Sequence, residues 1–218
     1  MADVVYGRRA VAEARRGRRS VMRLWTSEET GADELTRICG SPDHQGVVAE
    51  VEPYPYADPE VLLDAPNALI VALDQVQDPH NLGAVARSAE AAGATGLVIP
   101  DRRAAAVTPT VCKASAGAVE HLAIARVRNL ADWLVGAKTR EGLWTYGAAA
   151  DGADVYSAID LTGPLVLVLG SEGKGLRPRV AAACDALVSI PLRGRTESVN
   201  VSAAAAVLLF EAVRQRES

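Results

Sequence analysis

Residues 68–87 read ALIVALDQVQDPHNLGAVAR, and this stretch contains the pattern on which most of the chain is built. It begins with an unbroken apolar run that ends at Asp74, continues through a polar loop, and enters a helical segment at Leu82 that Asn81 is expected to cap. Because the run is apolar throughout rather than at alternate positions, it predicts a strand covered on both faces. Such a strand followed by a helix predicts an α/β fold with a parallel sheet.

The same rhythm continues to the end of the chain. Further strands are expected at Gly96–Pro100, His121–Val127, Leu143–Ala148, Leu165–Gly170 and Ala186–Pro191. Helices are expected at Leu82–Ala92, Thr110–Ala118, Leu130–Arg140, Arg177–Cys184 and Val199–Arg216. Ligands of parallel sheets bind at the carboxyl ends of the strands, so we expect a site in the loops after Asp74, Gly170 and Pro191.

The residues before Ala68 are organised differently. Short strands and helices are expected to alternate at Val4–Tyr6, Gly7–Arg16, Val21–Thr26, Asp33–Cys39 and Val47–Val51. Three prolines between Pro53 and Pro59 interrupt regular structure and mark a linker. We therefore expect a small α+β domain over residues 1–56, a linker over 57–67 and the main α/β domain over 68–218.

The composition bounds the class of protein. Of the 218 residues, 49% are hydrophobic and 23% are charged, which suits a globular chain with a substantial core. Cys39, Cys112 and Cys184 are too widely spaced for a disulfide framework or a zinc site, so we expect reduced thiols and no metal. The chain has neither a signal-peptide pattern nor an 18-residue apolar run, and a cytoplasmic location is expected.

The charge is unevenly distributed. Residues 1–23 hold seven arginines and two carboxylates, a net +5, so the rest of the chain carries −9 of the overall −4. The excess of arginine over lysine has two explanations, codon bias in a GC-rich genome or recognition of phosphate by guanidinium groups. A basic arm on an acidic body is typical of nucleic-acid binding, although a solvated helix face has a similar composition. The candidate contacts are Arg8, Arg9, Arg15, Arg16, Arg18 and Arg19.

Residues 169–176 read LGSEGKGL, and their three glycines allow the backbone to approach a ligand closely. The spacing differs from the dinucleotide fingerprint G-x-G-x-x-G, and Lys174 is not followed by the Ser or Thr of a Walker loop. The carboxylate of Glu172 would repel a phosphate, so this loop suits a neutral or cationic ligand.

Residues 190–202 read IPLRGRTESVNVS and lead into the last helix. Ser198 is expected to cap that helix, since serine is a favoured N-cap residue. Asn200 is then expected inside the first turn, where an asparagine has less structural reason to occur.

The three loops together resemble the three motifs of the SpoU/TrmH family of ribose methyltransferases, within the SPOUT superfamily. The matching patterns are N-x-G-A-x-x-R-x-A from Asn81, L-G-S-E-G-x-G from Leu169 and I-P-x-x-G-x-x-x-S-x-N-V-S from Ile190, and the resemblance extends from Ala68 to about Arg216. It implies a C-terminal deep trefoil knot, whereas the pattern alone predicts an unknotted doubly wound sheet. It also implies S-adenosylmethionine as cofactor, RNA as substrate, and a homodimer with its active sites at the subunit interface.

The resemblance further implies roles for individual residues. The catalytic set is Asn81, Arg87, Glu172, Ser198 and Asn200, with Arg87 also touching RNA. The cofactor-binding positions are Leu169, Gly170, Ser171, Gly173, Gly175, Ile190, Leu192, Val199, Asn200 and Val201. Because a guanidinium is almost never deprotonated, we expect Arg87 to act through its field, with Asn81 orienting it and Glu172 holding Asn81.

Other stretches indicate the branch of the family. Gly7-Arg8, the run from His44 to Ala49, and the run from Lys113 to His121 are closest to enzymes that methylate a guanosine of 23S ribosomal RNA. Two features depart from the family: Val199 replaces the usual leucine, and the N-terminal RNA-binding domain is shortened by a strand–helix unit between Cys39 and Gly46. The alternatives are a ribose methyltransferase acting on transfer RNA, or a non-catalytic RNA-binding or ribosome-assembly protein; a Rossmann oxidoreductase lacks its fingerprint.

Overall fold

The strand predicted from the opening pattern forms the middle of the main sheet. In the computed structural model, which describes residues 2–218, strand β4 (Leu69–Asp74) is buried at every position. It pairs in parallel with β5 (Gly96–Pro100) on one side and with β9 (Leu165–Gly170) on the other. The full strand order in the described residues is β6-β5-β4-β9-β7-β10-β8, and every pairing is parallel. The outer strands are β6 (Ile124–Val127), β7 (Trp144–Ala148), β8 (Asp154–Val155) and β10 (Ala186–Ser189).

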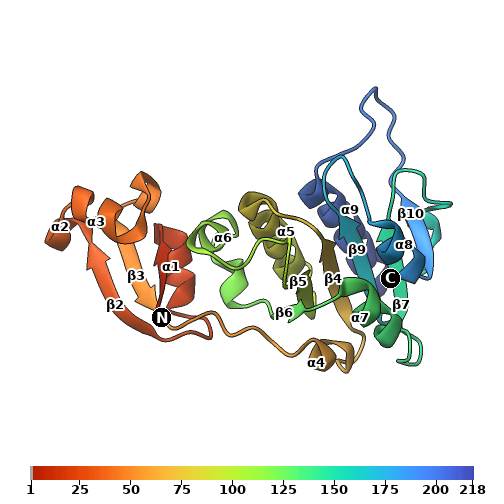
Figure 1. Ribbon diagram of the computed structural model, residues 1–218, viewed down its shortest axis with the longest axis horizontal. Coiled ribbons are helices and arrows are strands. Elements are labelled where there is room, and N and C mark those ends of the chain that lie inside the picture. Colours follow the sequence, from red (N-terminus) through yellow and green to blue (C-terminus); the bar gives the residue numbers. More distant parts are fainter. Residues whose placement is uncertain (1) are drawn as a thin grey trace.

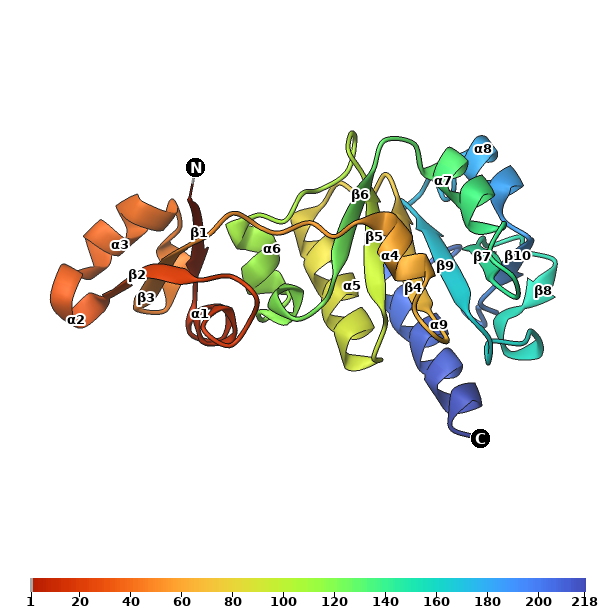
Figure 2. The ribbon, with the colours of Figure 1, turned by 90° about the horizontal axis from the view of Figure 1, so that it is seen from below.

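Helices cover both faces of this sheet, as the unbroken apolar strands predict. Leu69, Val71 and Leu73 of β4 face the hydrophobic cluster that contains α5 (Pro79–Ala91), α6 (Pro109–Ala114) and α9 (Val201–Arg216). The intervening Ile70 and Ala72 face a second cluster. That cluster is formed with α4 (Pro59–Leu63), α7 (Leu130–Ala137) and α8 (Pro178–Ala183). Figure 2 shows α5 and α9 side by side along the sheet, where they are in contact.

The N-terminal residues form a small separate sheet that packs on α6. Strands β1 (Asp3–Tyr6), β3 (Val47–Val51) and β2 (Val21–Thr26) pair antiparallel in that order. The accompanying helices are α1 (Arg8–Ala14), α2 (Ser27–Thr30) and α3 (Ala32–Cys39). Figure 1 shows the resulting elongated molecule, with α2 and α3 at one end and β10 at the other. Residues of β1 and α1 belong to the same hydrophobic cluster as α5, so apolar packing is continuous between the two parts.

Some local structure differs from the prediction. The segment 57–67, which stays a predicted linker, contains the short helix α4, which Asp58 caps by accepting a hydrogen bond from the Glu60 N–H at 3.0 Å. The segment expected as a strand from His121 becomes extended only at Ile124, because a 3-10 helix, η2 (Ala118–Glu120), precedes it. Two further 3-10 helices are η1 (Pro42–His44) and η3 (Tyr156–Ala158).

The predicted fold class is confirmed, an α/β fold built on a parallel sheet. The threading of the C-terminal segment into a knot stays a prediction. No helix within residues 2–218 is both long enough and apolar enough to cross a membrane. The same residues contain no group of three or more His, Cys, Asp or Glu side chains placed to hold a metal ion.

Candidate active site

Three loops meet at the carboxyl ends of β4, β9 and β10, as the sequence predicts, and the first of them leads into α5. That helix begins at Pro79, because the side chain of Asp78 accepts a hydrogen bond from the His80 N–H at 2.8 Å. The prediction that Asn81 caps this helix is therefore wrong. Asn81 lies within the first turn, and its side chain is left free to make contacts outside the helix.

The side chains of Asn81, Glu172 and Asn200 form one hydrogen-bonded cluster. The Asn81 Nδ2 donates to Glu172 Oε1 at 3.0 Å, and the Asn200 Nδ2 donates to Asn81 Oδ1 at 3.0 Å. Asn200 Nδ2 also contacts Glu172 Oε1. One carboxylate oxygen thus receives two amide donors, from segments 91 and 28 residues away along the chain. The cluster ties the three loops together at one point.

Asn200 also begins the last helix. Its Oδ1 accepts a hydrogen bond from the Ser202 N–H at 2.8 Å, which makes Asn200 the N-cap of α9. The prediction that Ser198 caps this helix, with Asn200 inside the first turn, is therefore wrong. Asn200 uses its oxygen to start the helix and its nitrogen to bind the other two loops, so the position of α9 is linked to that of Asn81 and Glu172.

The glycine loop folds back tightly on the end of β9. The Gly175 N–H donates to the Ser171 carbonyl at 2.9 Å, and a Cβ placed on Gly170 would lie 2.1 Å from the Gly175 carbonyl carbon. Gly173 and Gly175 have φ values of 72° and 63°, which favour glycine. A side chain at Gly170 would therefore open the turn and displace Glu172.

A buried carboxylate anchors this loop to β4, a contact that the sequence analysis missed. Asp74, fully buried, accepts hydrogen bonds from the backbone N–H and from Nε of Arg177, both at 2.8 Å. The signal available in the sequence was an acid ending an apolar strand and an arginine following the glycine loop. The pair fixes the carboxyl ends of neighbouring strands relative to each other.

The third loop is open to solvent. Residues 191–200 are all exposed, including the apolar side chains of Leu192 and Val199, and Figure 1 shows the loop standing out from the body of the molecule. Among residues 2–218, no backbone hydrogen bond outside the helices and sheet ladders involves positions 191–199. The backbone donors and acceptors of this loop and its two exposed apolar side chains are therefore available to a ligand.

Two predicted catalytic residues stand apart from the hydrogen-bonded cluster. Arg87 is exposed on α5, and Ser198 is exposed on the third loop. Neither side chain has a hydrogen bond or ion pair to the described residues, and the expected contact between Asn81 and Arg87 is not formed. The guanidinium of Arg87 is thus available to a ligand.

The arginine-rich N-terminus divides into exposed and structural members. Arg8, Arg9, Arg15 and Arg16 are exposed, as an RNA-binding role requires. Arg19 is a correction: its side chain is 2% exposed and forms an ion pair with the fully buried Glu120. Burial opposes its charge, yet the hydrogen bond and attraction from Glu120 hold the Arg19 pKa above its ordinary value. Arg19 joins the segment between α1 and β2 to η2 and has almost no surface to offer RNA.

Arg18 is likewise engaged with the rest of the protein. Its guanidinium contacts the carbonyls of Glu120 and Leu122 and the hydroxyl of Tyr54, although part of the residue stays exposed. Its main contacts therefore hold the N-terminal part against the main domain.

The three loops lie within a segment that matches a known protein family. Residues 68–210 match the model of the SpoU rRNA Methylase family. A Bacillus subtilis protein named as a TrmH family tRNA/rRNA methyltransferase, YacO, is 38% identical over 240 aligned positions, which cover 98% of this chain and 96% of that protein. Because the alignment is longer than 218 residues, that relative carries residues that this chain lacks. The chain spans 62–96% of the length of the first three curated relatives.

Solved structures share the same fold. The SpoU methyltransferase AviRb from Streptomyces viridochromogenes, crystallised with the cofactor AdoMet, superposes with a TM-score of 0.83 at 29% identity, covering 100% of this chain and 91% of that one. A structure described as an RNA 2′-O ribose methyltransferase superposes with a TM-score of 0.80 at 25% identity, covering 99% of this chain and 89% of that one. The likeness therefore includes the N-terminal part as well as residues 68–210, which match the family model.

Proposed function

Since this chain belongs to the SpoU rRNA Methylase family, we propose that it transfers a methyl group from S-adenosylmethionine to a ribose 2′-hydroxyl of RNA. The observation that carries the proposal is the cluster of Asn81, Glu172 and Asn200, in which one residue from each of the three loops is held by the other two. Such an arrangement aligns a donor bound by the second and third loops with an acceptor bound beside the first, which is the main requirement of a group transfer between two substrates.

The reaction forms a bond between the 2′-oxygen and the methyl carbon, breaks the bond from that carbon to sulfur, and releases the hydroxyl proton. When bound, S-adenosylmethionine supplies an already activated methyl group. The protein must therefore align the acceptor and stabilise the charge that develops on its oxygen. Arg87 fits that task because its exposed guanidinium has no partner within residues 2–218 and carries a permanent positive charge.

The remaining residues of the set act by positioning. Glu172 fixes the side chain of Asn81, and Asn200 fixes both while it begins α9. Ser198 lies two residues before Asn200, on the loop that would border the acceptor. We assign the cofactor to the backbone of the second and third loops, at Leu169, Gly170, Ser171, Gly173, Gly175, Ile190, Leu192, Val199, Asn200 and Val201.

The proposed substrate is a guanosine of 23S ribosomal RNA, modified in the cytoplasm. It is supported by Gly7-Arg8 and by the runs at residues 44–49 and 113–121, which resemble the branch with that substrate. The exposed Arg8, Arg9, Arg15 and Arg16 give the N-terminal part the charge needed to hold an RNA backbone. We propose this part, residues 1–56, as the RNA-binding domain and residues 68–218 as the catalytic domain.

We further propose that the active protein is a homodimer. Helix α9 carries Val207 and Phe210 with exposed fractions of 38% and 49%, and the third loop adds the exposed Leu192 and Val199. Apolar side chains of this size on a helix that begins at the site are typical of an interface. A second copy seated there would cover the open loop and complete the active site.

The test is transfer of tritiated methyl groups from S-adenosylmethionine to total bacterial RNA, followed by mapping of the labelled nucleotide. Label at a 2′-O-methylguanosine of 23S RNA is the expected result. Label in transfer RNA would mean that the proposed reaction is correct and that its substrate is transfer RNA. Binding of RNA without transfer, in a preparation shown by calorimetry to bind no S-adenosylmethionine, would instead identify a non-catalytic protein on the same fold.

A further inference from the structure

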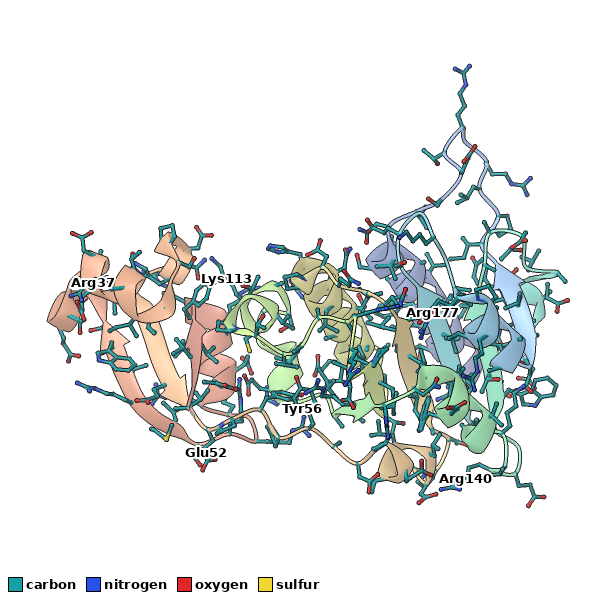
Figure 3. All side chains as sticks on the ribbon, viewed as in Figure 1. Arg37, Glu52, Tyr56, Lys113, Arg140 and Arg177 are labelled. Carbon is teal, nitrogen blue, oxygen red and sulfur yellow. The ribbon has the colours of Figure 1, made fainter. Side chains whose placement is uncertain are left out.

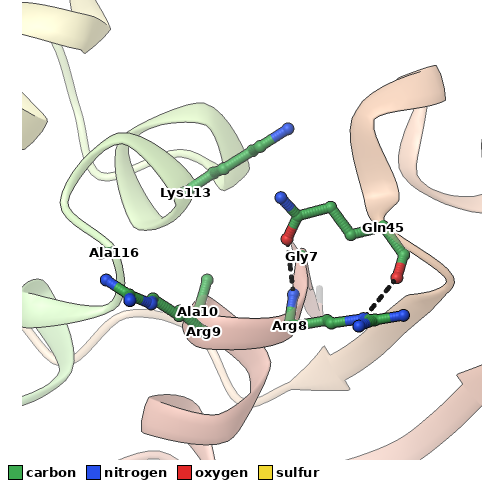
Figure 4. Close-up of a pocket in the computed structure, with 7 residues that line it drawn as sticks. All are labelled: Gly7, Arg8, Arg9, Ala10, Gln45, Lys113 and Ala116. Atoms are coloured by element: carbon green, nitrogen blue, oxygen red, sulfur yellow. Dashed lines mark hydrogen bonds between the residues drawn. The ribbon is translucent and has the colours of Figure 1, made fainter.

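A pocket lies where the N-terminal part meets the main domain, and the proposed chemistry does not use it. It has a volume of about 560 Å³ and is lined by Gly7, Arg8, Arg9, Ala10, Gln45, Lys113 and Ala116 (Figure 4). Five of them (Gly7, Arg8, Gln45, Lys113 and Ala116) come from the three stretches that resemble the ribosomal RNA branch of the family, and Arg9 and Ala10 follow the first of these stretches. We propose that this pocket, here called the junction pocket, binds a phosphate group of the RNA backbone; the proposal rests on the RNA methyltransferase function proposed above.

The charge of the lining of the junction pocket favours an anion. Arg8, Arg9 and Lys113 bring three positive charges, and none of the seven lining residues is acidic. Arg9 is exposed and, within residues 2–218, has neither a hydrogen bond nor an ion pair. Lys113 Nζ donates one hydrogen bond to the Asp43 carbonyl at 2.6 Å and lies 3.6 Å from the Asp43 carboxylate. That side chain is 74% exposed to solvent, so its attraction is weak, and the ammonium has further protons to donate to a ligand.

Gln45 adds an uncharged donor. Its Oε1 accepts a hydrogen bond from the Arg8 backbone N–H at 3.0 Å, and its backbone carbonyl accepts one from Arg8 Nε at 3.2 Å. Figure 4 shows that the amide nitrogen is thereby left facing the Lys113 side of the pocket. The positive φ of Gly7, 95°, lets the chain turn from β1 into α1 at this point, and a Cβ there would lie 3.3 Å from Gln45 Oε1. The side chains of Gln45 and Arg8 are therefore held in place before any ligand arrives.

The two halves of the junction pocket are also held rigidly. Arg8 and Arg9 come from α1, and Lys113 comes from α6. The buried ion pair between Arg19 and Glu120 joins these halves. The hydroxyl of Tyr54 adds a hydrogen bond to the Val119 carbonyl at 2.9 Å. A phosphate bound between the halves would therefore have a fixed position relative to the rest of the molecule. A phosphate bound by a flexible basic arm would not.

The junction pocket is linked to the candidate active site by the packing of α6 on α5. Helix α6 packs so closely on α5 that a Cβ on Gly83 would lie 2.6 Å from the Cβ of Ala114. Ala114 follows Lys113, and Gly83 is two residues from Asn81. Figure 3 shows Lys113 and Arg177, which binds the end of β4, on the same side of the molecule, with Glu52, Tyr56 and Arg140 on the other. An RNA strand anchored at the pocket can thus run across α6 to Arg87 and the acceptor site.

Lysine footprinting tests this placement on the unmodified protein. The chain has three lysines, Lys113, Lys138 and Lys174, so acetylation read by mass spectrometry gives three separate signals. Deproteinised total bacterial RNA should slow acetylation of Lys113 several-fold and leave Lys138, paired with Asp185 on the main domain, unchanged. Equal rates at Lys113 with and without RNA would overturn the proposal. So would full protection by inorganic phosphate at millimolar concentration, which would indicate a site for a free anion.

Charge-removing variants give an independent measurement. The double variant R9Q/K113Q should bind the same RNA about tenfold more weakly at 0.1 M salt and lower the slope of log affinity against log salt by about 1–2, since each lost phosphate contact contributes about 0.7–0.9. R37Q, on α3 and paired with Glu34, is the matched control and should bind as the wild type does. R15Q removes a charge at the other end of α1. An equal loss in R15Q would mean that RNA responds to the charge of the whole arm, which overturns a defined pocket.

Failure of this proposal can be told apart from failure of the proposed function. Wild-type protein is first titrated with S-adenosylmethionine and assayed for methyl transfer. If both succeed and R9Q/K113Q binds RNA like the wild type, only the junction pocket is wrong. If the wild type binds no cofactor and transfers no methyl group, the proposed function itself is wrong.

Discussion

The amide of Asn81 donates a hydrogen bond to the carboxylate of Glu172 at 3.0 Å, across 91 residues of sequence. The same carboxylate oxygen receives the amide of Asn200, so Glu172 is the shared acceptor of the cluster. Because Asp78 rather than Asn81 caps α5, the asparagine has no other structural task at this position. The role that remains for the Asn81 side chain is to align the three loops.

Removing the shared acceptor should therefore slow the reaction with little effect on folding. E172A is expected to lower kcat by about 10², the cost of misplacing reacting groups by about an ångström. E172Q keeps one carbonyl acceptor and should lose less. Steady-state methyl transfer separates kcat from KM, and a thermal melt checks the fold. E141Q, at an exposed glutamate in the turn before β7, is the control; an E172A enzyme with normal kcat would show that the cluster does not position the reactants.

Arg87 is expected to be essential for transfer and dispensable for cofactor binding. R87A should abolish methylation, because it removes the only charge proposed to stabilise the developing oxyanion, while affinity for S-adenosylmethionine stays within a few-fold. Calorimetry measures the affinity and tritium transfer measures the rate. R102A, at an exposed arginine after β5, controls for loss of a surface charge. Normal turnover by R87A would remove this residue from the mechanism.

Features that depend on local sequence could be predicted, whereas features that depend on contacts between distant residues could not. The limits of β5 and β9 agree with prediction, because continuous burial on both faces leaves an unbroken apolar run. The start of α5 does not, because both Asp78 and Asn81 are good caps and only the fold decides between them. The likeness of the three loops predicted the membership of the site. The predicted contact between Glu172 and Asn81 is formed. The bond from Asn200 to Asn81, and the absence of the expected contact between Asn81 and Arg87 in the described residues, required coordinates.

Arg19 illustrates the same limit for charge. In the sequence it is one of seven arginines within 23 residues, with nothing to distinguish it from Arg15 or Arg16. Its partner, Glu120, lies 101 residues away and is fully buried. A local charge count cannot detect such a pair, so the predicted basic arm included a residue that belongs to the core.

Breaking this buried ion pair should destabilise the protein strongly. R19A leaves the Glu120 carboxylate buried without its partner and should cost about 3–5 kcal/mol of unfolding free energy. The double variant R19M/E120L removes both charges and should recover a large part. R16A breaks an exposed pair with Glu13 and should cost under about 1 kcal/mol. Urea denaturation measures all three. A small loss in R19A, equal to that in R16A, would contradict the structural role given to Arg19.

The proposed dimer predicts a separate effect on assembly. F210D places a charge on the exposed apolar face of α9 and should convert the dimer to a monomer in sedimentation equilibrium, with methyl transfer reduced by about tenfold or more. V135D puts the same charge on an exposed valine of α7, 59% accessible, and should leave both mass and activity unchanged. A monomeric wild-type protein with full activity would contradict the proposal, as would an F210D protein that remains dimeric.

The stability of the fold should also fall at alkaline pH through a partly buried thiol. Burial raises the pKa of Cys184 from its ordinary value of 9.0 to about 11, so the folded protein keeps this proton in a range where the unfolded chain loses it. The thiol therefore stabilises the fold fully below pH 9, and the stabilisation is lost as the pH rises from 9 to 11. Between pH 8.5 and 10.5, wild type should lose about 1–2 kcal/mol more unfolding free energy than C184A does. Urea titrations at several pH values measure the difference, with C39A as the control for removal of a thiol; parallel curves for wild type and C184A would show that Cys184 ionises as readily in the folded protein as in the unfolded chain.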